Sequence, residues 1–174
     1  LVLCEQGSEA TLVEHYLGTE GSTFLTCGVT EVILDSDARL QHVRLVEGAA
    51  RASHLGMIAV RVCQSSSYIS RLVTLGGELS RVDIDVALEG EGAECTLEGT
   101  YFAGAREHVD HHTRVTHGEP HGTSREVYRG VVTGDGTVVF DGTVVVAKGA
   151  QKTSAHQENR NLLLSRDATV HTKP

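Results

Sequence analysis

Residues 79–88 read LSRVDIDVAL and carry the clearest structural signal in the chain. On an extended backbone one side carries the apolar residues Val82, Ile84, Val86 and Leu88. The other side carries the charged residues Arg81, Asp83 and Asp85. Strict alternation of this kind is typical of a β-strand that buries one face and exposes the other to solvent. The stretch therefore predicts a strand with a hydrophobic inner face.

Similar alternation recurs along much of the chain, at residues 58–62, 69–75 and 109–115. Val, Thr and Ile, whose branched side chains favour strands, make up 43 of the 174 residues, whereas Pro occurs only twice. Two continuous apolar runs, 138–140 and 144–146, predict short strands that are buried on both faces. We therefore expect an all-β protein.

Glycines separate these runs at short intervals and predict the turns. The best helical candidate is residues 49–57, and Ser53 and Gly56 weaken it. The glycines read as turn signals are Gly18, Gly21, Gly28, Gly48, Gly76, Gly77, Gly90, Gly92, Gly99, Gly104, Gly130, Gly134, Gly136, Gly142 and Gly149.

The glycines also belong to a weak internal sequence repeat, which we call the echo. The triplets that begin at Gly90 and Gly134 are 44 residues apart, and the triplets that begin at Glu98 and Asp141 are 43 residues apart. Short strands, glycine turns and a faint period favour a β-solenoid, in which each coil stacks on the last. A jelly roll or β-sandwich is the alternative architecture.

The composition excludes several classes of partner. The chain carries 23 acidic and 15 basic residues, a formal net charge of -8, which argues against binding to nucleic acid or to an anionic membrane. No apolar run approaches the roughly 20 residues that span a bilayer. The four cysteines, Cys4, Cys27, Cys63 and Cys95, are widely spaced and form no C-x-x-C pair. We expect free thiols in a cytoplasmic protein.

Five histidines between His108 and His121 are the densest group of possible metal ligands. If residues 108–115 form a strand, His111 shares a face with Val109, whereas His108 and His112 lie on the other face. One strand therefore cannot supply a compact metal site, and a hydrogen-bonding or solvent-facing role is the alternative. A metal-dependent enzyme or binding module on a small β-barrel would have to use His111, His117 and His121.

Other catalytic motifs are missing. The chain contains neither a G-x-S-x-G elbow nor a P-loop. Gln157, Asn159 and Asn161 are rich in hydrogen-bonding groups, and at a solenoid corner such residues form ladders that satisfy buried backbone groups. We therefore assign no catalytic, cofactor-binding or metal-ligating residue.

Longer motifs resemble the SufB/SufD family of iron–sulfur cluster assembly proteins. The similarity covers about residues 88–174, and it is looser at residues 10–16 and 40–44. Two segments, 149–153 and 159–165, look more like the SufD branch than the SufB branch. The motifs that carry the resemblance are HVDHHTR (108–114), PH (120–121), TSREVYRGV (123–131), FDG (140–142), GAQKT (149–153), NRNLLLS (159–165) and TKP (172–174).

The resemblance implies a right-handed parallel β-helix and a non-enzymatic scaffold role in the SUF system. It implies SufB-like and SufC-like partners, and an iron–sulfur cluster that the full complex handles rather than this chain. It also suggests a fragment of a longer protein, since the family's terminal helical regions have no counterpart here. We expect one β-helix domain over residues 1–174, with edge strands that favour a homodimer.

Overall fold

The computed structural model describes residues 1–18, 21 and 23–173, and within them the chain forms strands and turns without a helix. All the strand pairings are parallel, and the strands lie in two sheets. The seven-stranded sheet contains β1 (Val2–Cys4), β3 (Phe24–Leu34), β5 (Ala52–Val62), β7 (Leu79–Leu88), β9 (His108–His117), β11 (Thr137–Val146) and β13 (Thr169–Lys173). The six-stranded sheet contains β2 (Glu9–Leu17), β4 (Arg39–Gly48), β6 (Ser67–Gly76), β8 (Glu94–Ala103), β10 (Thr123–Val132) and β12 (Ser154–Leu163).

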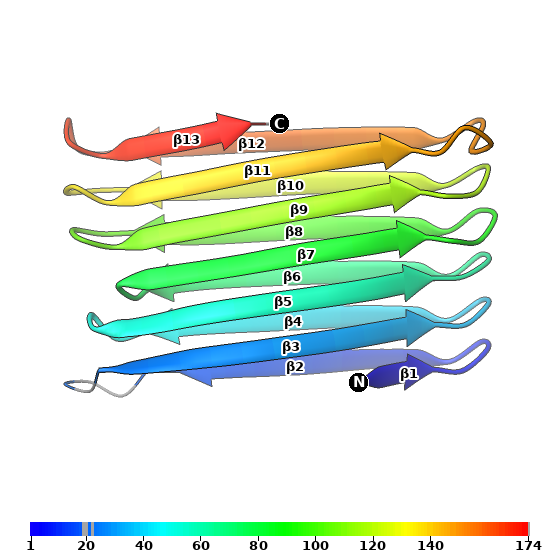
Figure 1. Cartoon of the computed structure of the whole chain (residues 1–174), viewed down its shortest axis with the longest axis horizontal. Helices are drawn as coiled ribbons and strands as arrows, with labels where there is room; N and C mark the ends of the chain where they lie inside the picture. The colour runs from blue at the N-terminus through cyan, green and yellow to red at the C-terminus, as the bar shows by residue number, and fades with distance from the viewer. Residues whose placement is uncertain (19–20, 22, 174) are drawn as a thin grey trace.

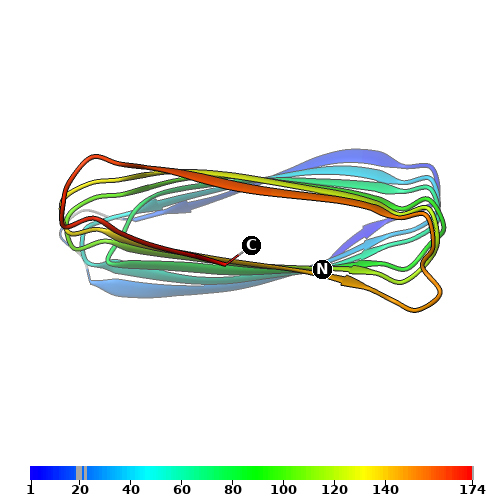
Figure 2. The same cartoon turned by 90° about the horizontal axis from the view of Figure 1, so that it is seen from above.

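The chain alternates between the two sheets and rises by one strand spacing with each circuit (Figure 1). In Figure 1 the front strands run to the right, the back strands run to the left, and the chain climbs from β1 to β13. Seen from above, the two sheets form a long, flat cross-section (Figure 2). This path is a right-handed parallel β-solenoid. The predicted fold is therefore confirmed, and the alternative of a jelly roll or sandwich is wrong.

One coil contains about 29 residues, and this length explains the echo in the sequence. Thr123 follows its register partner Glu94 by 29 residues, and the turns vary this length from coil to coil. An offset of 44 residues is thus close to one and a half coils. It relates the turn at Gly92 to a turn at Gly134 on the opposite side of the solenoid, so the echo is not the structural repeat.

The alternating residues behave as the sequence predicts. Val82, Ile84 and Val86 on β7 point inward and are almost completely buried. In the register of the seven-stranded sheet, Val86 lies between Val60 and Val115, so identical side chains stack along the solenoid axis. Each buried valine contributes about 1.5–3 kcal/mol relative to an exposed one, and the stack forms a narrow core between the sheets.

One local prediction is wrong, and the weak helical candidate is not a helix. The apolar runs at 138–140 and 144–146 belong to one strand, β11, whose outward residues are partly exposed rather than buried on both faces. Most of the candidate helix at residues 49–57 is instead the start of β5, where the backbone is paired on both sides. In both places the local structure is determined by the strand register with the neighbouring coils. This register cannot be predicted from a short stretch of sequence.

Four glycines that the sequence analysis read as turns lie in the middle of strands and point inward. A Cβ on Gly99 would overlap the ring of Tyr128, and one on Gly130 would overlap the ring of Tyr101. Gly28 is covered by Tyr16, and Gly142 by Gln157. Each glycine therefore leaves space for one large side chain, because the flat interior has no room for two.

Candidate functional site

Polar side chains gather inside the solenoid in two places. In the N-terminal half, Glu14, Thr30, His42 and Arg44 form the first group, which we call the Glu14 cluster. The Nη2 atom of Arg44 lies 2.9 Å from Oε2 of Glu14, and Nε lies 3.0 Å from the same oxygen. His42 Nε2 is 2.8 Å from that oxygen, and the Thr30 hydroxyl donates to Oε1 at 2.9 Å. The Arg44 side chain is fully buried, so this ion pair lies in a low-dielectric interior.

The charges of the Glu14 cluster set its protonation. Burial alone would raise the pKa of Glu14, but the charge of Arg44 and the hydrogen bonds from His42 and Thr30 outweigh it, and the pKa is lowered. Burial lowers the pKa of His42 despite the nearby carboxylate. Because a carboxylate only accepts hydrogen bonds, the neutral imidazole donates from Nε2 to Glu14. Its Nδ1 then accepts from the hydroxyl of Tyr68, 2.9 Å away.

The second group lies in the C-terminal half; we call Thr113, Glu126, Tyr128 and Gln157 the Glu126 cluster. Glu126 is fully buried, and its Oε2 lies 2.6 Å from the Thr113 hydroxyl oxygen, within hydrogen-bonding distance. Gln157 lies beside Glu126 in the register of β10 and β12. The Oε1 atom of Glu126, the Tyr128 hydroxyl and Nε2 of Gln157 make no hydrogen bond with the described residues. This cluster therefore contains an acid without a cationic partner.

A hydrogen-bonded chain of neutral groups lies beside it. The Tyr101 hydroxyl donates to Oδ1 of Asn161 at 2.6 Å and accepts from Nδ2 of Asn159 at 2.8 Å. Both asparagines come from the inner face of β12, in the middle of the strand. The expected corner ladder serving backbone groups is therefore not formed by these two residues. Instead they bind a tyrosine side chain two coils away.

The proposed metal ligands do not converge. His111 is buried between the rings of Tyr101 and Tyr128, with centroids 5.3 and 5.9 Å away, and its Nε2 lies 3.0 Å from the Thr74 hydroxyl. His117 is buried further along β9, with Nε2 2.9 Å from the hydroxyl of Ser124.

The third residue of that set, His121, lies on an exposed turn, 3.9 Å from Glu91. His112 points outward beside Asp110, and His108 also lies on the outer face, so the predicted division of the strand into two faces is correct. Among the residues that the structure describes, no group of three or more metal-binding side chains gathers anywhere. The β-barrel metal enzyme is therefore not favoured.

The cysteines also lie apart. All four are free thiols: Cys4 and Cys95 are buried, Cys63 is partly buried and Cys27 is exposed. Burial raises the pKa of Cys95, so this thiol stays protonated. Nothing in their placement resembles a paired redox site.

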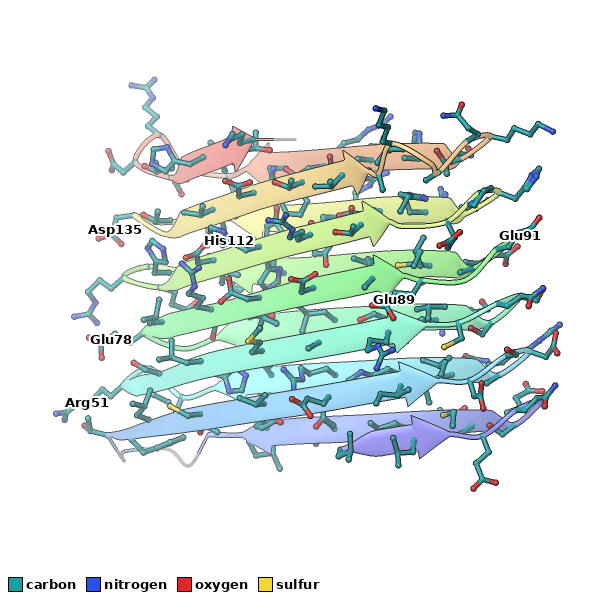
Figure 3. The ribbon with its side chains drawn as sticks, turned by 45° about the vertical axis from the view of Figure 1, so that its right-hand side comes forward. Arg51, Glu78, Glu89, Glu91, His112 and Asp135 are labelled. Carbon is teal, nitrogen blue, oxygen red and sulfur yellow. The ribbon has the colours of Figure 1, made fainter. Side chains whose placement is uncertain are left out.

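Charged side chains are dispersed over the exterior of the solenoid. Figure 3 shows Glu89 and Glu91 at the turns on one side of the coils and Arg51, Glu78 and Asp135 on the other. Several outward ion pairs join neighbouring coils; Arg61 and Glu89, for example, lie 2.9 Å apart. Both side chains are about half exposed, so such a pair adds at most about 1 kcal/mol. In the described part of the chain, no helix is long and apolar enough to cross a membrane.

Sequence reasoning missed the interior clusters, although a signal for them exists. In residues 39–48 the inward positions are Leu40, His42, Arg44 and Val46, so a charged residue stands at an inward position between apolar ones. Glu126 breaks the pattern of β10 in the same way. A charge on the buried face of an alternating strand predicts a partner inside the core, but not which strand provides it.

Comparison with known proteins identifies the relatives of this solenoid. The family described as "SUF system FeS cluster assembly, SufBD core domain" matches residues 1–174. The chloroplastic protein ABCI7 of Arabidopsis thaliana is 33% identical over 99% of this chain, which corresponds to 37% of that protein. A SufBD family iron–sulfur cluster assembly protein of Synechocystis is 28% identical over the whole chain and 40% of its own length.

The iron–sulfur cluster assembly protein SufD of Escherichia coli is 27% identical over 97% of this chain, or 40% of its own length. The chain thus spans less than half of each of these relatives. The match of the family over every residue agrees with the two-sheet solenoid and with the motifs in its C-terminal half. The chain belongs to the SufBD core domain family of the SUF iron–sulfur cluster assembly system.

Proposed function

We propose that this domain is the scaffold core of a SufD-like subunit in the iron–sulfur cluster assembly machinery. The observation that carries the proposal is the family match over residues 1–174 on a regular parallel solenoid. A solenoid of paired strands is stiff and presents two broad outer faces, which suits a part that holds other subunits in place. In this proposal, SufB-like and SufC-like subunits are the partners of the longer protein that contains this domain.

Co-expression tests this scaffold role. The longer protein carrying this domain is tagged and produced with the SufB-like and SufC-like proteins of the same organism, then purified and sized. We expect one complex that contains all three subunits. Recovery of the tagged protein alone, while the other two subunits associate with each other, would overturn the proposal.

We further propose that the domain is not an enzyme and holds no resident cofactor. The cluster is then the cargo of the assembled complex. This part of the proposal is supported by the dispersed positions of His111, His117 and His121. Iron, zinc and acid-labile sulfide are measured in the purified domain after chelator treatment. Each should remain well below one equivalent, and a stoichiometric metal that resists chelation would contradict this expectation.

The edge strands support a proposed homodimer of the isolated domain. The six-stranded sheet ends at β2 and β12, and the seven-stranded sheet at β1 and β13, so each leaves backbone groups of an outer strand unpaired. Light scattering at increasing concentration should show a dimer, and a monomer at the highest concentration would contradict it.

We also propose a cytoplasmic location, supported by the four free thiols. Cell fractionation with an antibody to the domain tests it, and recovery in another compartment would overturn it.

A further inference from the structure

Glu126 is the most deeply buried acid in the described part of the chain. It projects inward from β10, and none of its surface reaches solvent. One carboxyl oxygen, Oε2, is 2.6 Å from the Thr113 hydroxyl, and the other, Oε1, makes no hydrogen bond with the described residues. An ionised carboxylate in this position would have one charged oxygen without a donor, which is strongly unfavourable in a protein interior.

No positive charge compensates this acid. Among the ion pairs of the described residues, none involves Glu126. None of the inward residues around it is charged: Thr113 on β9, Tyr128 on β10 and Gln157 on β12 are polar, and its register partner on β8 is the apolar Leu97. On β11 the inward position next to Thr113 is Gly142.

The titratable groups that face this region are also uncharged near neutral pH. Burial lowers the pKa of His111 on β9 to about 3, so its imidazole is neutral. Burial also lowers the pKa of His117 on the same strand. Burial raises the pKa of Cys95 on β8 and of Tyr128 on β10, so both keep their protons. Tyr101 on β8 likewise has a raised pKa because it is buried.

We propose that the Glu126 carboxyl is a proton-binding site, and that the folded solenoid holds this side chain as an uncharged acid at neutral pH. The proton lies on Oε2 and is donated to the oxygen of the Thr113 hydroxyl. A distance of 2.6 Å suits an O–H···O bond in either direction. Oε1 is then a neutral carbonyl oxygen beside the Gln157 amide, and leaving it unpaired costs much less than leaving an anion unpaired.

This arrangement also determines how the stability of the folded protein changes with pH. Burial raises the pKa of Glu126. The Thr113 and Gln157 side chains lower it, but their effect is smaller. In the unfolded chain a glutamate has a pKa of about 4.3, so between that pH and the folded pKa only the folded state keeps the proton. The contribution of Glu126 to stability is therefore greatest at low pH and is lost as the pH rises through this window.

Two measurements on the domain test the proposal, with Glu126→Gln as the variant. The first is infrared spectroscopy of the folded protein at pH 7. We expect the wild type to show the carbonyl stretch of a protonated carboxylic acid, and the variant to lack it. This measurement needs no comparison of stabilities. The second is urea unfolding from pH 5 to pH 8. The folding constant of the wild type relative to Glu126→Gln should fall about tenfold per pH unit up to the folded pKa and then level off.

Glu14→Gln is the matched control, because Glu14 is an inward glutamate that has a cationic partner. The ionisation of Glu14 lies below this pH range, but Glu14 also raises the pKa of His42, so within pH 5–8 the wild-type folding constant relative to Glu14→Gln should be constant above about pH 6.5. A wild-type infrared spectrum at pH 7 without a protonated-acid band that Glu126→Gln removes would overturn the proposal. A wild-type to Glu126→Gln ratio independent of pH over the same range would overturn it as well.

Discussion

In the N-terminal half of the interior Glu14 lies beside a guanidinium, whereas in the C-terminal half Glu126 lies beside hydroxyl and amide groups. Both acids project inward from strands of the same sheet, four coils apart. The pKa of Glu14 is lowered by Arg44 and its other partners, and the pKa of Glu126 is raised by burial. In this fold, therefore, the inward residue on the neighbouring strand, rather than the depth of burial alone, decides whether an inward acid carries charge.

The largest expected effect comes from removing the cation of the Glu14 cluster. Arg44→Met leaves Glu14 and its hydrogen-bond partners without a compensating charge, and breaking a buried ion pair from one side costs about 3–5 kcal/mol. Urea unfolding followed by circular dichroism measures the loss. Arg71→Ala is the control, since Arg71 pairs with Glu98 at 3.0 Å on the half-exposed exterior and should cost less than about 1 kcal/mol. Equal losses for the two variants would contradict the distinction between interior and surface pairs.

Acid should destabilise the N-terminal half through His54. Burial, aided by the charge of Arg44, lowers the pKa of His54 to about 4. A histidine in the unfolded chain has a pKa of about 6.5, so below that pH the unfolded state binds the proton first and stability falls by up to about 1.4 kcal/mol per pH unit. His54→Gln should flatten this part of the curve between pH 6.5 and 4. Neither ring nitrogen of His54 has a hydrogen-bond partner among the described residues, so the variant breaks no such bond. An unchanged acid slope would rule out this role for His54.

Gly99→Ala tests the pairing of glycines with large inward side chains. The new Cβ would overlap the ring of Tyr128, and overpacking of a filled core costs about 1–3 kcal/mol. Thermal unfolding measures the effect. Gly149→Ala is the matched control, because no heavy atom lies within 4 Å of its Cβ position, and it should change stability by less than about 0.5 kcal/mol. If both variants are neutral, the interior is looser than the packing of Tyr128 implies.

A smaller effect distinguishes two tyrosines of the C-terminal half. Tyr101→Phe removes a hydroxyl that bonds both Asn159 and Asn161, and we expect a loss of about 1–2 kcal/mol. Tyr128→Phe removes a buried hydroxyl that has no hydrogen-bond partner among the described residues, so it should be neutral or stabilising. Calorimetric unfolding of the two variants checks the order, and the reverse order would be inconsistent with the hydrogen bonds of Tyr101.

The sequence predicts the solenoid well because its main signal is local. Alternation at residues 79–88 identifies β7 and the face that it buries, and residues 109–115 place His111 inside and His112 outside in the same way. Glycine is less informative. Gly92 and Gly134 do occupy turns with positive φ, whereas Gly99 fits beneath Tyr128 inside a strand, and the sequence alone does not distinguish these uses.

The interior clusters depend on contacts between coils, so the local pattern marks an inward charge but does not identify its partner. Glu14 meets Arg44 because β2 and β4 are neighbours one coil apart, and Thr30 reaches both from the opposite sheet. Predicting that contact requires the length of each coil, which differs from turn to turn. The alternative metal site at His111, His117 and His121 is not favoured for a different reason: β9 ends at His117, and His121 lies on an exposed turn beyond it.

The parallel register also makes the domain mechanically anisotropic. Strand β8 is hydrogen-bonded to β10 along all of Glu94–Ala103, and these bonds point along the solenoid axis. A force that pulls the two ends apart along the axis loads one rung after another and peels off the outermost coil. A force along the strands, applied between two neighbouring coils, must shear the whole row of bonds at once.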